Sequence, residues 1–186
     1  MEFSKLIGLR KSIRSYQNRP VEEWKIDQLI EAVRLAPSAS NSQPWKLIIV
    51  DRPDVKNNVA KATYSKLVSF NKFAPQAPVI AVLTIEKPKV VTQIGGRLKD
   101  REFPLIDIGI AAVQFCLQAA ELGLGTCMLG WFDEDAIKKL LAIPEKTRVG
   151  LVITLGYADE GSVKKRMRKD RAIMCSFNTY SNKKST

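Results

Sequence analysis

A short basic segment near the start of the chain has the composition of a phosphate-binding site. Arg10, Lys11, Ser12 and Arg14 place three cations and a hydroxyl within five residues. A guanidinium offers a planar set of donors that fits phosphate oxygens, and a serine hydroxyl adds one more donor. In an extended segment, alternate side chains point the same way, which would put Arg10, Ser12 and Arg14 on one side. Such a run is more often a solvated surface, so the segment alone does not establish a site.

A second candidate is a connector of small polar residues at 36–45, with the sequence Ala-Pro-Ser-Ala-Ser-Asn-Ser-Gln-Pro-Trp. Turn-rich segments of this kind separate a helix from a strand. They leave backbone N–H and C=O groups and amide side chains free to hydrogen-bond a flat heteroaromatic ring. The alternative is an ordinary turn, and the residues alone do not decide between the two.

Two further segments could lie close to a ligand. Three glycines fall within residues 123–130, where the absence of side chains permits close approach of the backbone. Gly123 and Gly125 end a helix instead of following a strand, so they do not match a dinucleotide-binding fingerprint. A second basic cluster, Arg-Met-Arg-Lys at 166–169, is by itself more typical of solvated surface.

The composition limits the chemistry. The 186 residues contain no histidine, which excludes a Ser-His-Asp triad, a Cys-His pair and a His-ligated metal. Difficult chemistry would therefore come from a cofactor. Three widely spaced cysteines predict free thiols in a reducing compartment. The polar residues 1–11 do not form a signal peptide, and the apolar stretch 106–120 is short for a membrane span, which favours a cytoplasmic protein.

Hydrophobic periodicity predicts the elements that must position these residues. Helices are expected at 2–9, 21–35, 54–72, 104–122 and 133–141, and strands at 45–50, 78–85, 126–130 and 149–155. Residues 86–103 show no clear period and are interpreted as a flexible excursion that could cover a site. The helix at 104–122 is apolar nearly all round, which predicts burial on every side. The basic and apolar tail, 161–186, is expected to pack on something, such as another subunit. We expect a single domain over 1–186.

Taken together, these segments resemble the nitroreductase family of FMN-dependent oxidoreductases. The matching pieces keep the family's order and spacing over nearly the whole chain. They are Arg-Lys-Ser-Ile-Arg-Ser-Tyr at 10–16, the connector at 36–45, residues 122–133, and residues 152–157 followed by the cluster at 166–169. The pattern Pro-Ser-x-x-Asn-x-Gln-Pro-Trp is the most specific of them. Asp170 departs from the family, because many relatives have proline at that position.

The resemblance implies an α+β fold: an α/β sandwich with a mixed, mainly antiparallel sheet flanked by helices. It also implies an obligate homodimer in which the C-terminal tail extends over the partner, with one FMN at each of two interface sites. Such a dimer would explain why the helix at 104–122 and the tail are apolar.

The resemblance further implies which residues hold the flavin. The phosphate and ribityl chain would be bound by Arg10, Ser12, Arg166 and Arg168, with Lys11 contributing through its backbone. Arg14 would lie near N1 and O2 of the ring, where a cation stabilises reduced flavin. The partner subunit would supply Pro37, Ser38, Ala39 and Asn41. Asn71 would reach the pyrimidine edge, and the backbone of Met128, Leu129 and Gly130 would run beside the ring with an N–H near N5.

The function implied by the resemblance is an NAD(P)H-dependent flavin oxidoreductase. Hydride would pass from NADH or NADPH to flavin N5 and then to a nitroaromatic, quinone or related acceptor in a ping-pong sequence, with no side chain acting as acid, base or nucleophile. The alternative is a non-enzymatic flavin carrier or sensor of the same fold. The net charge of +11 also permits a nucleic-acid-binding protein. That interpretation is weaker because the basic residues are spread out, apart from a denser run at 164–171, and no helix-turn-helix, zinc-finger or RNP pattern occurs.

Overall fold

A four-stranded antiparallel sheet forms the centre of the molecule. The computed structural model describes residues 2–67, 69–159 and 167–180. The strands are β1 (Trp45–Val50), β2 (Val79–Ile85), β3 (Gly125–Leu129) and β4 (Arg148–Gly156), in the order β1-β2-β4-β3. All four predicted strands are confirmed. The sheet differs from the expected mixed type, because the strand pairs of the described chain are antiparallel and the parallel element is an isolated bridge from Ser12 to Thr126.

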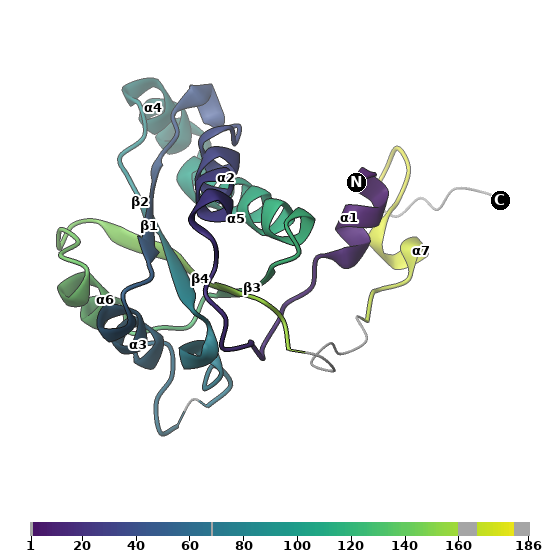
Figure 1. The fold of residues 1–186 in the computed structure, drawn as a ribbon. Helices are drawn as coiled ribbons and strands as arrows, with labels where there is room; N and C mark the ends of the chain where they lie inside the picture. The colour runs from purple at the N-terminus through teal and green to yellow at the C-terminus, as the bar shows by residue number, and fades with distance from the viewer. Residues whose placement is uncertain (1, 68, 160–166, 181–186) are drawn as a thin grey trace.

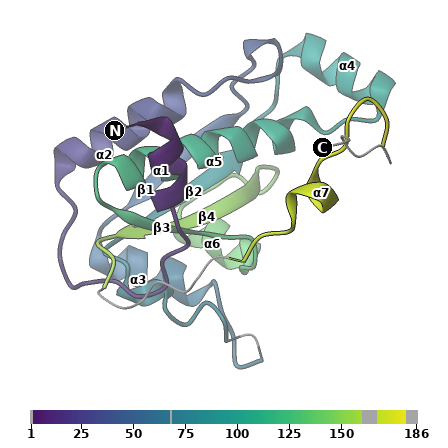
Figure 2. The same cartoon turned by 90° about the vertical axis from the view of Figure 1, so that its right-hand side faces the viewer.

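Helices cover both faces of this sheet (Figures 1 and 2). On one face lie α2 (Glu23–Arg34) and α5 (Phe103–Glu121), and on the other lie α3 (Pro53–Lys61) and α6 (Glu134–Leu140). Strand β2 shows why both faces are covered: its run of Val, Ile, Ala and Leu is buried throughout, with Ile80 and Val82 in one apolar cluster and Ala81 and Leu83 in the other. Side chains of a strand alternate between faces, so an uninterrupted apolar run needs cover on both.

Helix α5 is the principal core helix, yet one of its faces is open. Seven of its residues are buried, and it packs against α2 and three strands. Its opposite face exposes Ile106 by 55% and Val113 by 43%, with Gly109 between them. The prediction of burial on every side is therefore wrong for a single chain. By length and composition α5 could cross a membrane, but its packing on the sheet identifies it as a core helix.

Two sequence predictions about the connecting segments are also corrected. The helix expected at 54–72 ends at Lys61, and a 3-10 turn, η2 (Ala74–Gln76), follows a turn-rich segment. The excursion expected at 86–103 contains a ten-residue helix, α4 (Val90–Lys99). Its two central glycines lower its helix propensity, and its apolar residues at a spacing of four face solvent instead of the core.

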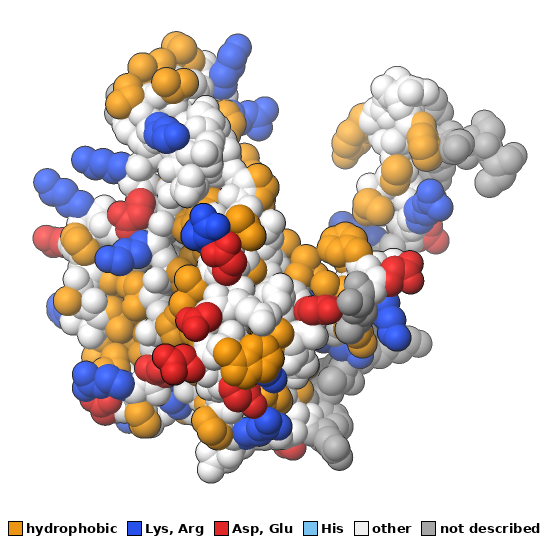
Figure 3. All heavy atoms as spheres, turned by 45° about the horizontal axis from the view of Figure 1, so that its top comes forward, with side chains coloured by type: hydrophobic (Ala, Val, Ile, Leu, Met, Phe, Trp, Pro, Cys, Tyr) orange, Lys and Arg blue, Asp and Glu red, His pale blue; other side chains and the backbone are white. Residues whose placement is uncertain are grey.

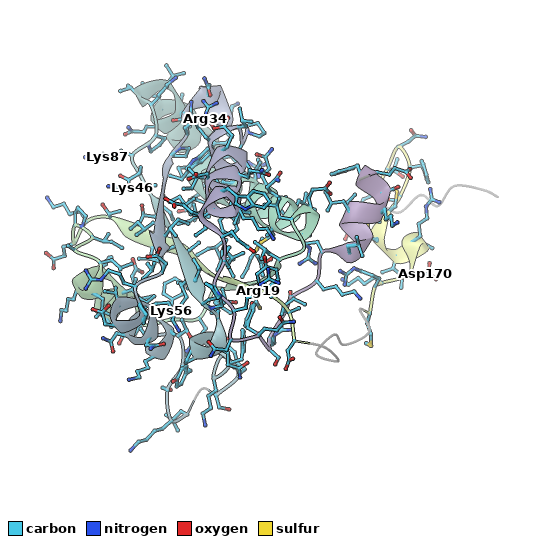
Figure 4. All side chains as sticks on the ribbon, in the orientation of Figure 1. Arg19, Arg34, Lys46, Lys56, Lys87 and Asp170 are labelled. Carbon is cyan, nitrogen blue, oxygen red and sulfur yellow. The ribbon has the colours of Figure 1, made fainter. Side chains whose placement is uncertain are left out.

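The first and last helices project from the body of the molecule (Figure 1). Helix α1 (Phe3–Leu9) has no buried residue, and neither has α7 (Arg171–Met174), whose N-cap is the carboxylate of Asp170 (Figure 4). Figure 3 shows a hollow between the body and this projection, with apolar side chains on both sides. The exposed apolar side chains of these two helices include Phe3 and Ile7 of α1 and Ile173 of α7. These helices contribute little to the core of their own chain.

A polar network joins the start of α2 to the end of β4. Lys25 Nζ donates to Tyr157 Oη at 2.6 Å, and Tyr157 Oη donates to Glu22 Oε2 at 2.5 Å. The Arg19 guanidinium (Figure 4) lies 3.9 Å from the centre of the Tyr157 ring and also contacts Glu22. The Tyr157 hydroxyl, followed by smaller contributions from Lys25 and Arg19, lowers the pKa of Glu22 to about 2.

On the sheet face covered by α3 and α6, a buried lysine joins α3 to η2. Lys56 of α3 is buried, and its Nζ donates to the Pro75 carbonyl in η2 at 2.7 Å and to Asn57 Oδ1 (Figure 4). Desolvation lowers its pKa. The bonds to neutral acceptors satisfy the ammonium and tie η2 to α3.

Candidate functional site

The segment after α1 is fixed against the outer edge of β3. The Ile13 N–H donates to the Thr126 carbonyl at 2.9 Å, and the Ile13 side chain is buried against Gly125. Ser12 and Arg14 on either side of it are exposed. The alternation predicted for this segment is thus confirmed for Ser12 and Arg14, while Arg10 and Lys11 are half-buried.

Tyr16 anchors the other end of this segment inside the core. Its hydroxyl donates to the Ile13 carbonyl at 3.0 Å and lies 2.7 Å from Thr154 Oγ1. Burial is the main cause that raises the pKa of Tyr16, so this side chain remains a neutral phenol. Because both Ile13 and Tyr16 are held, the basic residues between positions 10 and 14 keep a defined place beside the sheet.

A pocket of about 440 Å³ opens beside Arg10 and Lys11. Its other walls are the end of α5, with Cys116 and Glu121, and residues 123–126 leading into β3. The pocket therefore has Arg10 and Lys11 at one side, the acidic Glu121 in another wall, and a mainly apolar lining elsewhere. Burial raises the pKa of Cys116 to about 11 and also raises the pKa of Cys127. Both groups stay as thiols at neutral pH, and Cys127 belongs to the apolar cluster on one face of the sheet.

The end of β3 offers open backbone next to aromatic side chains. Gly130 follows the strand, and no atom lies within 4 Å of the position a Cβ would take there. The next residue, Trp131, is 57% exposed and meets Phe70, 63% exposed, edge to face at 6.4 Å between ring centres. The predicted residue Asn71 is buried behind this pair, and its Nδ2 donates to the carbonyls of Thr63 and Trp131. Asn71 thus holds the two segments together.

The connector at 36–45 forms a strained turn around η1 (Ala39–Asn41). Ser40, Asn41 and Gln43 have φ of 52°, 48° and 47°, in the left-handed region that non-glycine residues rarely adopt. The turn is braced internally, since the Gln43 N–H donates to Ser38 Oγ at 2.8 Å. Pro37 and Asn41 are exposed, and Ser38 and Ala39 are half-buried. The predicted break between helix and strand is confirmed, and its strain is typical of binding sites.

The single chain does not bring all the predicted residues together. The η1 turn contacts α5 near its start, through Asp107, whereas residues 10–13 share a pocket with the end of α5, as far as Glu121. The rise of 1.5 Å per residue separates these two positions by about 21 Å. Figures 1 and 2 agree, since the loop between α2 and β1 lies beside α4, away from the segment that follows α1.

The basic cluster in the tail is described only in part. Arg168 is exposed, and its side chain donates to the Met167 carbonyl. It does not line the pocket beside Arg10. Arg166, the other predicted phosphate ligand, lies outside the described residues.

Four residues near the candidate site were missed from the sequence. They are the aromatic pair Phe70 and Trp131, and Asp107 and Thr92, whose side chains hydrogen-bond the backbone of Ala39. Two signals were available. Asp107 is the charged residue within the apolar stretch 106–120, and Trp131 is a large aromatic residue directly after a glycine. Phe70 and Thr92 gave no comparable signal, because their segments have no regular pattern.

Comparison with known proteins gives a consistent result. The model of the nitroreductase family matches residues 7–157. A protein of Archaeoglobus fulgidus assigned to the NADH dehydrogenases or NAD(P)H nitroreductases is 32% identical over 165 residues, which cover 84% of this chain and 85% of that protein. An FMN reductase [NAD(P)H] of Bacillus subtilis is 28% identical over 184 residues, covering 92% and 72%.

The fold agrees with these similarities. The structure of an FMN-dependent nitroreductase from Clostridium difficile superimposes with a TM-score of 0.75 at 27% identity, covering 94% of this chain and 98% of that one. The match extends over both helical layers and the sheet that carry the candidate site. The chain therefore belongs to the nitroreductase family.

Proposed function

We propose that this chain is an FMN-dependent oxidoreductase that uses NADH or NADPH to reduce nitroaromatic, quinone or related acceptors. The broader class, an NAD(P)H-dependent oxidoreductase, follows from family membership and from the activities named for several relatives. FMN, when bound, supplies the redox chemistry, taking a hydride from the nicotinamide and passing two electrons to the acceptor in a ping-pong sequence.

The observation that carries this proposal is the attachment of residues 10–14 to the edge of β3. It places exposed Ser12 and Arg14, with Arg10 close by, next to the strand that leads to Gly130. The donor set fits a flavin nucleotide: cations and a hydroxyl for the phosphate and ribityl chain, and open backbone at Gly130 for a flat ring. We assign Arg10, Ser12 and Arg168 to the phosphate, with the backbone of Lys11.

The ring would be held by groups from several segments. Arg14 would stabilise the negative charge of reduced flavin near N1 and O2. Asn71 would accept a hydrogen bond from the pyrimidine edge through Oδ1, because its Nδ2 already donates to the carbonyls of Thr63 and Trp131. The backbone of Met128, Leu129 and Gly130 would donate an N–H toward N5. The chain's groups would bind, orient and exclude water. Protons can come from solvent or from a ligand hydroxyl, so the absence of histidine is no obstacle.

A homodimer would complete the site. If two α5 helices pair antiparallel across a two-fold axis through their open faces, the start of one lies beside the end of the other. The turn at Pro37, Ser38, Ala39 and Asn41 would then meet the partner's residues 10–14, closing the separation of about 21 Å. The exposed apolar residues of α1, α5 and the tail support the same arrangement, with the tail extending over the partner and two FMN per dimer.

We also propose that residues 1–186 form one domain that works in the cytoplasm. The two apolar clusters share one sheet, which supports a single domain. The three cysteines are free thiols, as in a reducing compartment.

The direct test is a visible absorption spectrum of the purified protein, repeated without oxygen after addition of NADPH and then NADH. We expect an oxidised-flavin spectrum that bleaches with at least one donor. Flavin that bleaches with neither would contradict the reductase and favour a carrier or sensor. The double substitution Arg10→Ala and Arg168→Ala should give a folded protein that loses FMN, whereas Arg34→Ala and Arg52→Ala, at exposed arginines paired with acidic residues elsewhere, should retain it.

A further inference from the structure

Two buried polar side chains from different helices hold the backbone of Ala39. The Ala39 N–H donates to Asp107 Oδ1 of α5 at 3.1 Å, and Thr92 Oγ1 of α4 donates to the Ala39 carbonyl at 3.3 Å. Asp107 is 3% exposed and Thr92 is 4% exposed. Both backbone groups of one turn residue are thus fixed from outside the turn.

The residues that follow Ala39 need such support. Ser40, Asn41 and Gln43 all lie in the left-handed region, which is unfavourable for residues with a Cβ. Such conformations persist where the surroundings determine them. A third bond from outside the turn adds to the clamp, since the Lys89 N–H just before α4 donates to Ser42 Oγ at 2.6 Å.

The two oxygens of Asp107 differ in their surroundings. Asp107 Oδ2 is buried and has no hydrogen-bond partner among the described residues. A buried acceptor without a donor is unfavourable, whereas the Oδ1 of the same group accepts from the Ala39 N–H. The group is therefore best explained by its bond to Ala39.

We propose that Asp107 and Thr92 are positioning residues that clamp the turn at 37–43 in the conformation that contacts the flavin ring. This inference rests on the proposed function, since the turn is a flavin ligand only there. The clamp joins the turn to α4 and α5 together. In the proposed dimer these helices would therefore determine the shape of the partner's flavin site and leave the phosphate site of their own chain unaffected.

The first experiment compares Asp107→Ala with Gln114→Ala. Gln114 is a matched control because it lies two turns further along α5 and its Oε1 is also buried without a partner among the described residues. In apoprotein, Asp107→Ala should speed amide hydrogen exchange in peptides covering 37–43, and FMN added to it should bind roughly tenfold more weakly. Gln114→Ala should change neither. Equal exchange and equal FMN affinity in the two variants would overturn the clamp.

Conservative variants separate positioning from a general loss of structure. Asp107→Asn keeps an oxygen for the Ala39 N–H and should restore FMN affinity to within about twofold of the wild type. Thr92→Val keeps the shape but removes the hydroxyl, and should weaken FMN binding in the same direction as Asp107→Ala. If Asp107→Ala does not fold, Thr92→Val decides: unchanged exchange in 37–43 would refute the clamp.

A mixed dimer tests whether the turn acts on the partner's site. Chains carrying Arg10→Ala and chains carrying Asp107→Ala are co-expressed with different tags, and the mixed dimer is purified. If the turn acts across the interface, one site has both defects and the other has none, so FMN should bind to about half of the sites with wild-type affinity. If each site shows a single defect, the turn acts within its own chain. Wild-type FMN binding, measured separately, tests the proposed function itself.

Discussion

The contact between Gly125 and Ile13 makes a quantitative prediction about the phosphate-binding segment. A Cβ at position 125 would lie 2.6 Å from Ile13 Cγ1 and 2.9 Å from Ile13 Cβ. Distances below 3 Å force a shift, and a β-branched side chain has few rotamers by which to escape. In Gly125→Ala, Ile13 must therefore move outward together with its backbone, which carries Ser12 and Arg14.

Overpacking of this kind costs about 1–3 kcal/mol. For a chain of this size, a loss of about 2 kcal/mol lowers Tm by roughly 4–8 °C. Scanning calorimetry of the apoprotein measures this loss, and titration with FMN measures the second consequence, a weaker affinity because the segment leaves the edge of β3. Gly95→Ala in α4 is the control, since no atom lies within 4 Å of its Cβ position, and it should be neutral or slightly stabilising.

The double variant Ile13→Ala with Gly125→Ala checks the cause. Space released at position 13 should accommodate the new methyl group. The double variant should therefore lose less stability than the sum of the losses in the two single variants. If Gly125→Ala instead matches the wild type in both Tm and FMN affinity, the segment at 10–14 is not held by this contact, and the argument for a fixed phosphate site fails.

Two other predictions follow from contacts described above. Tyr157→Phe removes the hydroxyl that most lowers the pKa of Glu22 from its ordinary 4.5 to about 2. Between these two pH values the native state binds fewer protons than the unfolded state, so Glu22 stabilises the protein above about pH 4.5 and loses this effect as the pH falls toward 2. Tyr157→Phe should therefore show a weaker pH dependence of urea unfolding in this range. An unchanged Glu22 titration by NMR would contradict the assignment. Ile106→Glu places a charge on the open face of α5, and light scattering should show a monomer with reduced FMN content. A stable dimer with full flavin would exclude this face as the interface.

Much of the fold could be predicted from local patterns because each central element has a clear period. Strand β2 is a continuous apolar run and α5 a long apolar stretch ended by Gly123, so both were found within one or two residues. Helix α4 was missed because its apolar stripe is interrupted by glycines and turned toward solvent, where burial gives no signal. The open face of α5 could not be foreseen either, since a sequence does not distinguish contacts within a chain from contacts between chains.

The sequence identified the segments of the candidate site better than the contacts that bring them together. The residues at 10–14 and 128–130 come together because the Ser12 bridge to Thr126 joins them. No local pattern shows that the turn at 37–43 is strained, or that Asp107 bonds its backbone. These features depend on the packing of α4 and α5, which is set by residues far away in the sequence.

The place of β1 at the edge of the sheet has a consequence for solubility. Among the described strands, β1 pairs with β2 alone, so its other side lies at the edge of the described sheet. Its sequence, Trp-Lys-Leu-Ile-Ile-Val, is β-rich with a single charge, which is the composition of an aggregation-prone segment. The outward-facing Lys46 (Figure 4) is one protection. Substitutions that remove the Lys46 charge should therefore promote self-association through β1.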